Sequence, residues 1–154
     1  MLNLFHTILR RYFRINLVSD CPFCNLEKRV VRENKFANLF LSNPRKVAGH
    51  FLVTPKRHVE KPWEITKEET QAIFDLVFFA QKRLAERVSE GSDVLQHYRP
   101  FMKQNRIKVN HIHYHILPRG FNDNLYQKIE RHETEKNYEY LTDDERDEME
   151  KVVL

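Results

Sequence analysis

Cysteine is scarce in this chain, which has two among 154 residues, and no apolar run approaches the eighteen or so residues of a membrane span. The two cysteines stand three positions apart and cannot build a disulfide framework. A reducing compartment, with a metal or redox role for the pair, fits this usage better. We also find no internal repeat and no low-complexity tract. We therefore expect a soluble, cytoplasmic domain with no membrane span, long enough to bury a core.

The charges are divided along the chain. Residues 1–129 hold 22 Lys and Arg against 12 Asp and Glu, whereas residues 130–154 hold 4 against 10. A basic body favours anionic ligands such as nucleotides or nucleic-acid ends. Residues 1–17 contain three arginines and no acid, with apolar residues near helical spacing. We interpret them as an amphipathic helix packed on the domain or on a partner, with an organelle-targeting peptide as the alternative.

The first half of the chain predicts a hairpin and a long helix. Strand-like runs at Phe36–Ser42 and His50–Thr54 are separated by Asn43-Pro44 and Gly49, which are typical of a turn. A capping box at Thr66–Glu69 then begins a helix that ends near Ser89–Gly91. Its apolar residues recur at three- and four-residue steps: Ile73, Leu76, Val77, Ala80, Leu84 and Val88.

The second half predicts two further strands, at Val94–Tyr98 and Val109–Leu117, joined by a basic loop at Arg99–Lys108. A further cap at Thr142 predicts a short final helix.

Three histidines, His111, His113 and His115, occupy alternate positions. Alternation is the period of a β-strand, so all three imidazoles are predicted to lie on one face. The intervening residues are β-formers that can face the core: Ile112, Tyr114 and Ile116. The segment is therefore predicted to be both a packing element and a row of nucleophiles or metal ligands.

Cys21 and Cys24 have the two-residue gap with which paired thiolates bind a tetrahedral zinc, and His58 and His111 could complete the set. Four protein ligands leave no open position, so such a zinc would be structural. Two alternatives stay open. Cys-Pro-aromatic-Cys also resembles a glutaredoxin active site, and both cysteines could be buried thiols without a metal.

Together these features resemble the histidine triad (HIT) family. The segment His111–Leu117 has the family's alternation of histidine and hydrophobic residues, and Gly49–Val59 reads like its upstream strand. The resemblance covers residues 20–120, between an N-terminal basic amphipathic extension (1–19) and a charged C-terminal tail (121–154). It implies an α+β fold with a mainly antiparallel five-stranded sheet, one long helix and a short C-terminal helix. It also implies a homodimer, and nucleotidyl hydrolase or transferase chemistry on nucleoside phosphates.

The resemblance assigns roles to single residues. His113 becomes the nucleophile that attacks the α-phosphorus and forms a nucleotidyl-histidine intermediate, and His115 binds the phosphate oxygens. His58 and His111 match the zinc-binding members of the family.

Several positions depart from the family's pattern. Lys108 stands where a small hydroxyl residue is common and could contact phosphate instead. Leu41 replaces an acid that holds the ribose hydroxyls, which leaves Ser42 or Asn43 as substitutes. Three apolar residues fall where the family encloses the base: Phe23, Leu26 and Leu39.

We therefore expect a nucleotidyl hydrolase or transferase acting on nucleoside phosphoramidates, dinucleoside polyphosphates or related nucleotides. The alternatives are a nucleotide- or nucleic-acid-binding module without turnover, and a thiol redox protein.

Overall fold

A computed structural model describes residues 21–26, 29–105, 107–129 and 141–153. The chain divides into two compact units, residues 1–120 and residues 121–154. The extension predicted for residues 1–19 lies outside the described residues, as do residues 130–140 of the predicted tail.

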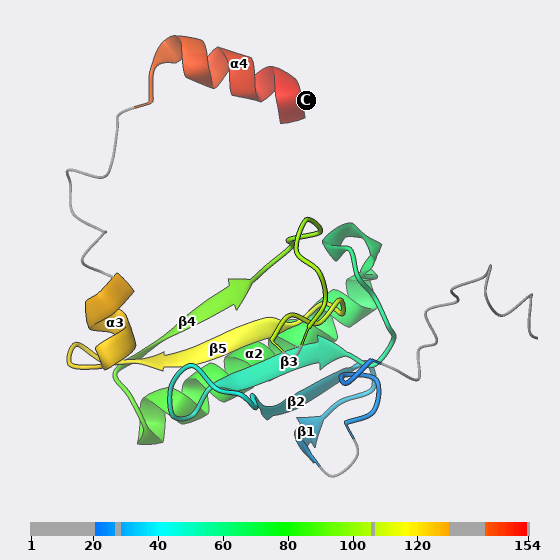
Figure 1. The fold of residues 1–154 in the computed structure, drawn as a ribbon, viewed down its shortest axis with the longest axis vertical. Helices are drawn as coiled ribbons and strands as arrows, with labels where there is room; N and C mark the ends of the chain where they lie inside the picture. The colour runs from blue at the N-terminus through cyan, green and yellow to red at the C-terminus, as the bar shows by residue number, and fades with distance from the viewer. Residues whose placement is uncertain (1–20, 27–28, 106, 130–140, 154) are drawn as a thin grey trace, which may run out of the picture. The chain divides into compact units, whose positions relative to one another are not determined.

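The first unit contains one five-stranded antiparallel sheet (Figure 1). Its strands are β1 (Val30–Glu33), β2 (Ala37–Leu41), β3 (Phe51–Pro55), β4 (Gly91–Gln96) and β5 (Tyr114–Arg119). Their order across the sheet is β1-β2-β3-β5-β4. β2 and β3 form the predicted hairpin, with Leu39 paired to Val53. The architecture confirms the predicted α+β class.

One long helix, α2 (Lys67–Arg87), packs across one face of the sheet against β2, β3, β4 and β5 (Figure 1). It begins at the predicted capping box: the Glu69 N–H donates to Thr66 Oγ1 (3.2 Å) and the Thr66 N–H donates to the Glu69 carboxylate (3.0 Å). The predicted apolar residues from Ile73 to Leu84 are buried against Leu39 and Val53.

A second, smaller core lies on the opposite face of the sheet. It contains Cys21, Phe23, Leu26, Phe40 and Leu52. Successive residues of one strand, such as Leu39 and Phe40, therefore serve different cores, as the period of two requires. This second core packs the segment with the two cysteines against the hairpin.

Two predicted strands have different bounds in the structure. The strand expected at Val94–Tyr98 begins earlier, at Gly91, and ends at Gln96. The strand expected from Val109 begins only at Tyr114. Just before Tyr114 the chain bonds to a different segment: the Ile112 N–H donates to the Val59 carbonyl (2.7 Å), and Thr54 Oγ1 donates to the Ile112 carbonyl (2.7 Å). The backbone N–H and carbonyl of Ile112 therefore have hydrogen-bond partners outside the sheet.

Three elements were not predicted: β1, the 3-10 helix η3 (Pro62–Glu64) and α3 (Asn124–Ile129). β1 is four residues long and largely exposed, so its sequence has no alternation of apolar and polar residues to reveal it. α3 belongs to the second unit, as does α4 (Asp143–Val153). α4 is the predicted short C-terminal helix, and the Glu145 N–H donates to Thr142 Oγ1 at its start (3.3 Å). Among the described residues no helix is long and apolar enough to cross a membrane.

A buried carboxylate connects the end of β3 to the start of α2. Glu69 is 5% exposed, and its two oxygens accept hydrogen bonds from Arg57 Nε (2.9 Å) and Nη2 (2.8 Å). Chiefly because of these bonds, the pKa of Glu69 lies below its usual 4.5. Arg57 directly precedes His58, so this ion pair holds in place the segment that carries a predicted metal ligand.

We expect Glu69→Gln to lower the free energy of unfolding at pH 7 by about 1–2 kcal/mol, because it removes one partner of a charged, part-buried pair. A folded-state pKa below the unfolded value contributes stability above pH 4.5, and the contribution is lost as pH falls through the folded value. The difference from wild type should therefore be constant between pH 7 and 5 and shrink below that range. Urea unfolding measures it, with the exposed neighbour Glu68→Gln as control. An undiminished difference at pH 3 would contradict this account.

Candidate active site and metal centre

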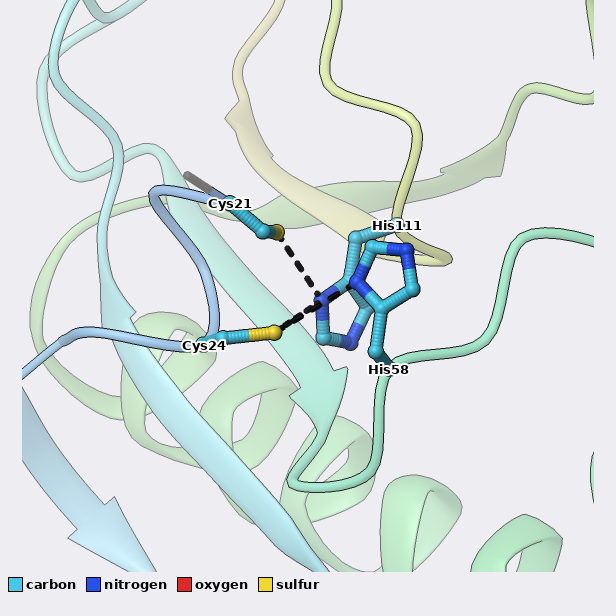
Figure 2. Close-up of side chains that lie close together, drawn as sticks. All are labelled: Cys21, Cys24, His58 and His111. Atoms are coloured by element: carbon cyan, nitrogen blue, oxygen red, sulfur yellow. Dashed lines mark hydrogen bonds between the residues drawn. The ribbon is translucent and has the colours of Figure 1, made fainter. Parts of the chain in front are cut away.

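Two cysteines and two histidines converge from three segments of the chain (Figure 2). Cys21 and Cys24 lie in a turn closed by the Cys24 N–H, which donates to the Cys21 carbonyl (3.1 Å). His58 follows β3 and His111 precedes β5. Their four ligand atoms, two Sγ and two Nδ1, all lie within 4.8 Å of one another. These residues could hold a metal ion.

Three of the distances between the ligand atoms of this cluster match a tetrahedral site. Cys21 Sγ lies 3.4 Å from His111 Nδ1, and Cys24 Sγ lies 3.4 Å from His58 Nδ1 and 3.6 Å from His111 Nδ1. Ligands of a tetrahedral zinc, with bonds of about 2.0–2.3 Å, are separated by roughly 3.3–3.8 Å.

The Nε2 atoms of both imidazoles, which are not the possible metal ligands, lie beside hydrogen-bond acceptors. His111 Nε2 donates to the Pro55 carbonyl (3.0 Å), and His58 Nε2 lies 3.3 Å from the Glu60 carboxylate. Such partners direct the Nδ1 lone pairs toward the thiols, as in metal-bound histidines.

The environment of the cysteines does not support the redox alternative. Burial and the adjacent Cys21 thiol raise the pKa of Cys24 to about 12, whereas a redox-active thiol needs a lowered pKa, commonly at a helix N-terminus. The pair lies in a turn, and no helix begins at Cys21–Cys24. A buried Cys21 beside a half-buried Cys24 whose pKa is raised is more consistent with a cation-binding role, since a bound cation would stabilise both thiolates.

The three alternating histidines divide between two sites. His111 belongs to the metal cluster, as we call the four possible ligands Cys21, Cys24, His58 and His111. The His113 and His115 rings lie 4.8 Å apart beside a separate cavity. Tyr114 and Ile116 pack with the α2 core on the other face. The predicted separation of faces is therefore present, although only His115 lies within a strand.

A hydrogen bond determines which nitrogen of His113 is free. Nδ1 lies 2.6 Å from the His111 carbonyl, which can only accept, so Nδ1 carries the proton and Nε2 keeps its lone pair. Burial, with a smaller contribution from the charge of Lys46, lowers the pKa of His113 below its usual 6.5. At neutral pH His113 is therefore an uncharged imidazole with a nucleophilic Nε2.

His50 determines the tautomer of His115. The Lys46 backbone N–H donates to His50 Nδ1 (3.1 Å), so His50 Nε2 carries a proton and donates it to His115 Nδ1 (2.9 Å). His115 must then carry its own proton on Nε2. Burial lowers the pKa of His50 to about 4 and that of His115 to about 3, so both rings are neutral. The site thus combines a nucleophilic nitrogen and a neutral N–H donor on adjacent rings.

The cavity beside these rings has a volume of about 310 Å³. Its walls include apolar side chains, polar side chains of the hairpin turn and cations: Phe23, Phe40, Leu52, Ser42, Asn43, Arg29, Arg45 and Lys46. An apolar wall beside a cationic one suits a ligand with a flat apolar part and a phosphate.

Sequence reasoning missed His50, Arg45 and Lys46 as parts of this site. The available signal was their position in the turn of a hairpin whose second strand leads toward His58.

Three predicted substrate-binding residues do not line this cavity. Leu39 is 2% exposed in the α2 core, because it and Phe40 face opposite sides of β2. Leu26 is buried in the second core beneath Phe23. Lys108 lines a neighbouring cavity, where its Nζ donates to the Met102 carbonyl. Phe40 and Lys46, in contrast, do line it.

The family model of the HIT domain matches residues 24–122. The chain belongs to the HIT domain family. It is 33% identical over 100 residues to bis(5'-adenosyl)-triphosphatase of Dictyostelium discoideum, a match covering 60% of this chain and 64% of that protein. It is 31% identical over 105 residues to adenosine 5'-monophosphoramidase of Schizosaccharomyces pombe, covering 65% and 74%. The chain therefore spans less than two thirds of the Dictyostelium relative.

Solved structures of HIT proteins share the fold. A HIT family protein from Bacillus anthracis aligns with a TM-score of 0.66 and 20% identity, covering 87% of this chain and 94% of that one. A Zn-bound histidine triad family protein from Mycobacterium smegmatis aligns with a TM-score of 0.61 and 22% identity, covering 70% and 80%. The predicted HIT-like fold is confirmed.

Proposed function

We propose that this HIT protein is a nucleotidyl hydrolase that acts at the α-phosphate of nucleoside phosphoramidates or dinucleoside polyphosphates. The observation that carries the proposal is the pair of fixed tautomers at the cavity, with Nε2 of His113 as lone-pair donor and Nε2 of His115 as N–H donor. The names of the Dictyostelium and Schizosaccharomyces relatives, a triphosphatase and a phosphoramidase, support the same class of reaction.

The reaction that we propose has two displacements. In the first, His113 Nε2 attacks the α-phosphorus, a P–N bond forms, and the leaving group departs with the electrons of the broken bond. The His111 carbonyl, which accepts from His113 Nδ1 (2.6 Å), stabilises the positive charge that develops on the ring. In the second, water attacks the phosphorus and releases the nucleoside monophosphate and a proton, and the bonding pair returns to His113 Nε2.

The remaining side chains of the cavity bind and orient the nucleotide. His115 Nε2–H donates to the phosphoryl oxygen on which negative charge builds, and Lys46 and Arg45 supply further positive charge. Phe23 and Phe40 contact the base, and their rings already lie edge to face at 5.3 Å. Ser42 and Asn43 are the candidates for the ribose hydroxyls.

We further propose that Cys21, Cys24, His58 and His111 bind a structural zinc ion. The donor set and the distances of 3.4–3.6 Å support this. When bound, the metal supplies cross-linking and charge neutralisation, because four protein ligands leave no place for a reactive water. Its role in the reaction would be indirect. A bound metal would hold His111 in place, and the carbonyl of His111 fixes the tautomer of His113.

The proposed function is tested by incubating the protein with nucleotides radiolabelled at the α-phosphate and quenching in acid or in base. We expect an adduct that survives base and is lost in acid, as a phosphohistidine-type bond should be, and release of the nucleoside monophosphate. Added inorganic phosphate or a sugar phosphate would give a nucleotidylated product if the enzyme is a transferase. Tight nucleotide binding without adduct or turnover, for every nucleotide tested, would instead favour a nucleotide-binding module.

A further inference from the structure

A second cavity, of about 200 Å³, adjoins the first. Val109 lines both. His97, at the end of β4, lines the second cavity, and its ring lies 5.3 Å from that of His115, which lines the first. The two cavities are therefore neighbours at Val109 and at the contact between the His97 and His115 rings.

The second cavity carries positive charge from Lys61, Arg99 and Lys108, and one acid, Glu60. The hydrogen bond from Lys108 Nζ to the Met102 carbonyl holds that ammonium group at the wall. The charge of Arg99 also lowers the pKa of Lys46, after burial, so the cations of the two cavities act on each other. A chain of phosphates spanning both cavities would relieve this repulsion.

An exposed aromatic pair borders the second cavity. Tyr98 lines it, and Trp63 of η3 contacts Tyr98 with ring centroids 5.1 Å apart at an interplanar angle of 71°. Trp63 is 68% exposed and Tyr98 is 40% exposed. Exposed ring faces beside cations are the pattern that binds a nucleobase together with its phosphate.

Resting on the proposed function, we infer that the second cavity is the binding site for the distal half of a dinucleoside polyphosphate substrate. The nucleoside whose α-phosphate is attacked occupies the first cavity. The remaining phosphates lie along Lys61, Arg99 and Lys108, and the distal base stacks on Trp63 and Tyr98. A nucleoside phosphoramidate with a small leaving group uses the first cavity alone.

Binding is tested without turnover by the fluorescence of Trp63, the only tryptophan of the chain. In a His113→Ala background, diadenosine triphosphate should quench this fluorescence, whereas AMP at saturating concentration should not. Quenching by both ligands would overturn the inference. So would the absence of quenching by diadenosine triphosphate at concentrations at which calorimetry shows that it binds. Stronger quenching by a single-stranded oligonucleotide than by the dinucleotide would overturn it in favour of nucleic-acid binding.

Kinetics give the second test. Trp63→Ala should lower kcat/KM for diadenosine triphosphate roughly tenfold, the effect of one lost stacking contact, and leave kcat/KM for adenosine 5'-phosphoramidate unchanged. Trp63→Phe should restore most of the loss. Phe78→Ala, which removes another exposed ring that lines neither cavity, is the matched control. Equal effects of Trp63→Ala on both substrates would contradict the inference.

The two proposals can fail separately. Turnover of the phosphoramidate with no effect of Trp63→Ala on the dinucleotide would refute the second cavity and leave the proposed function standing. Absence of turnover of either substrate, with specific quenching by the dinucleotide, would refute the hydrolase and support the second cavity.

Discussion

His113→Ala should lose the covalent nucleotidyl adduct, and its turnover should fall by roughly four orders of magnitude or more. The substitution removes the Nε2 lone pair that the structure presents beside the donor of His115. It leaves the metal cluster intact, because His113 contributes no ligand atom to it. Acid-labile labelling by an α-labelled nucleotide, together with steady-state kinetics, measures both effects.

The neighbouring histidines are the controls for that experiment. His115→Ala should still form the adduct, but roughly 100-fold to 1,000-fold more slowly, because a donor to the phosphoryl oxygen is lost and the nucleophile remains. His111→Ala should lose metal and stability. Substantial turnover in His113→Ala with unchanged zinc content and melting temperature would refute the assigned nucleophile.

Cys24→Ser should lose bound zinc and destabilise the domain by about 3 kcal/mol or more, which corresponds to a fall in Tm of roughly 10 °C. The metal cluster connects the segment before β1 to the loops after β3 and before β5, so losing it frees three segments at once. Wild-type protein should contain about one zinc per chain. Metal analysis and thermal unfolding, with and without a chelator, measure these effects.

The control is Val31→Thr, which alters a 58% exposed side chain of the adjacent strand β1 and should keep zinc and change Tm little. At saturating zinc, the loss in kcat of Cys24→Ser, expressed as a free energy, should be smaller than its loss in free energy of unfolding. The reason is that the metal is proposed to stabilise the fold and not to react. Full retention of zinc in the Cys21→Ser/Cys24→Ser double variant would exclude the proposed site.

Local patterns in the sequence were sufficient to predict the helix, the hairpin and the division of faces. The Thr66–Glu69 capping box and the three- and four-residue spacing of apolar side chains depend on neighbours within one or two helical turns, so they predict α2 without reference to any tertiary contact. Alternation in His111–Ile116 likewise predicts the separation of imidazoles from core residues, and Tyr114 and Ile116 do pack with the α2 core.

The two cysteines and two histidines of the metal cluster were also predicted together, because their spacing and residue types match a known ligand set. The tertiary structure supplies the distances: Cys21 and His111 are 90 positions apart, and their ligand atoms lie 3.4 Å from each other.

Only the tertiary structure decided which residues complete the candidate active site. His50 joins it through a hydrogen bond to His115 across adjacent strands, and that bond fixes the protons on both rings. Leu39 is excluded because the helix covers its face of β2. The late start of β5, at Tyr114, follows from hydrogen bonds that Ile112 makes with Thr54 and Val59. The sequence by itself determined the elements and the chemistry available. Partner choice among side chains distant in sequence was decided by the fold, because it depends on the register and direction of strands that meet only in the folded sheet.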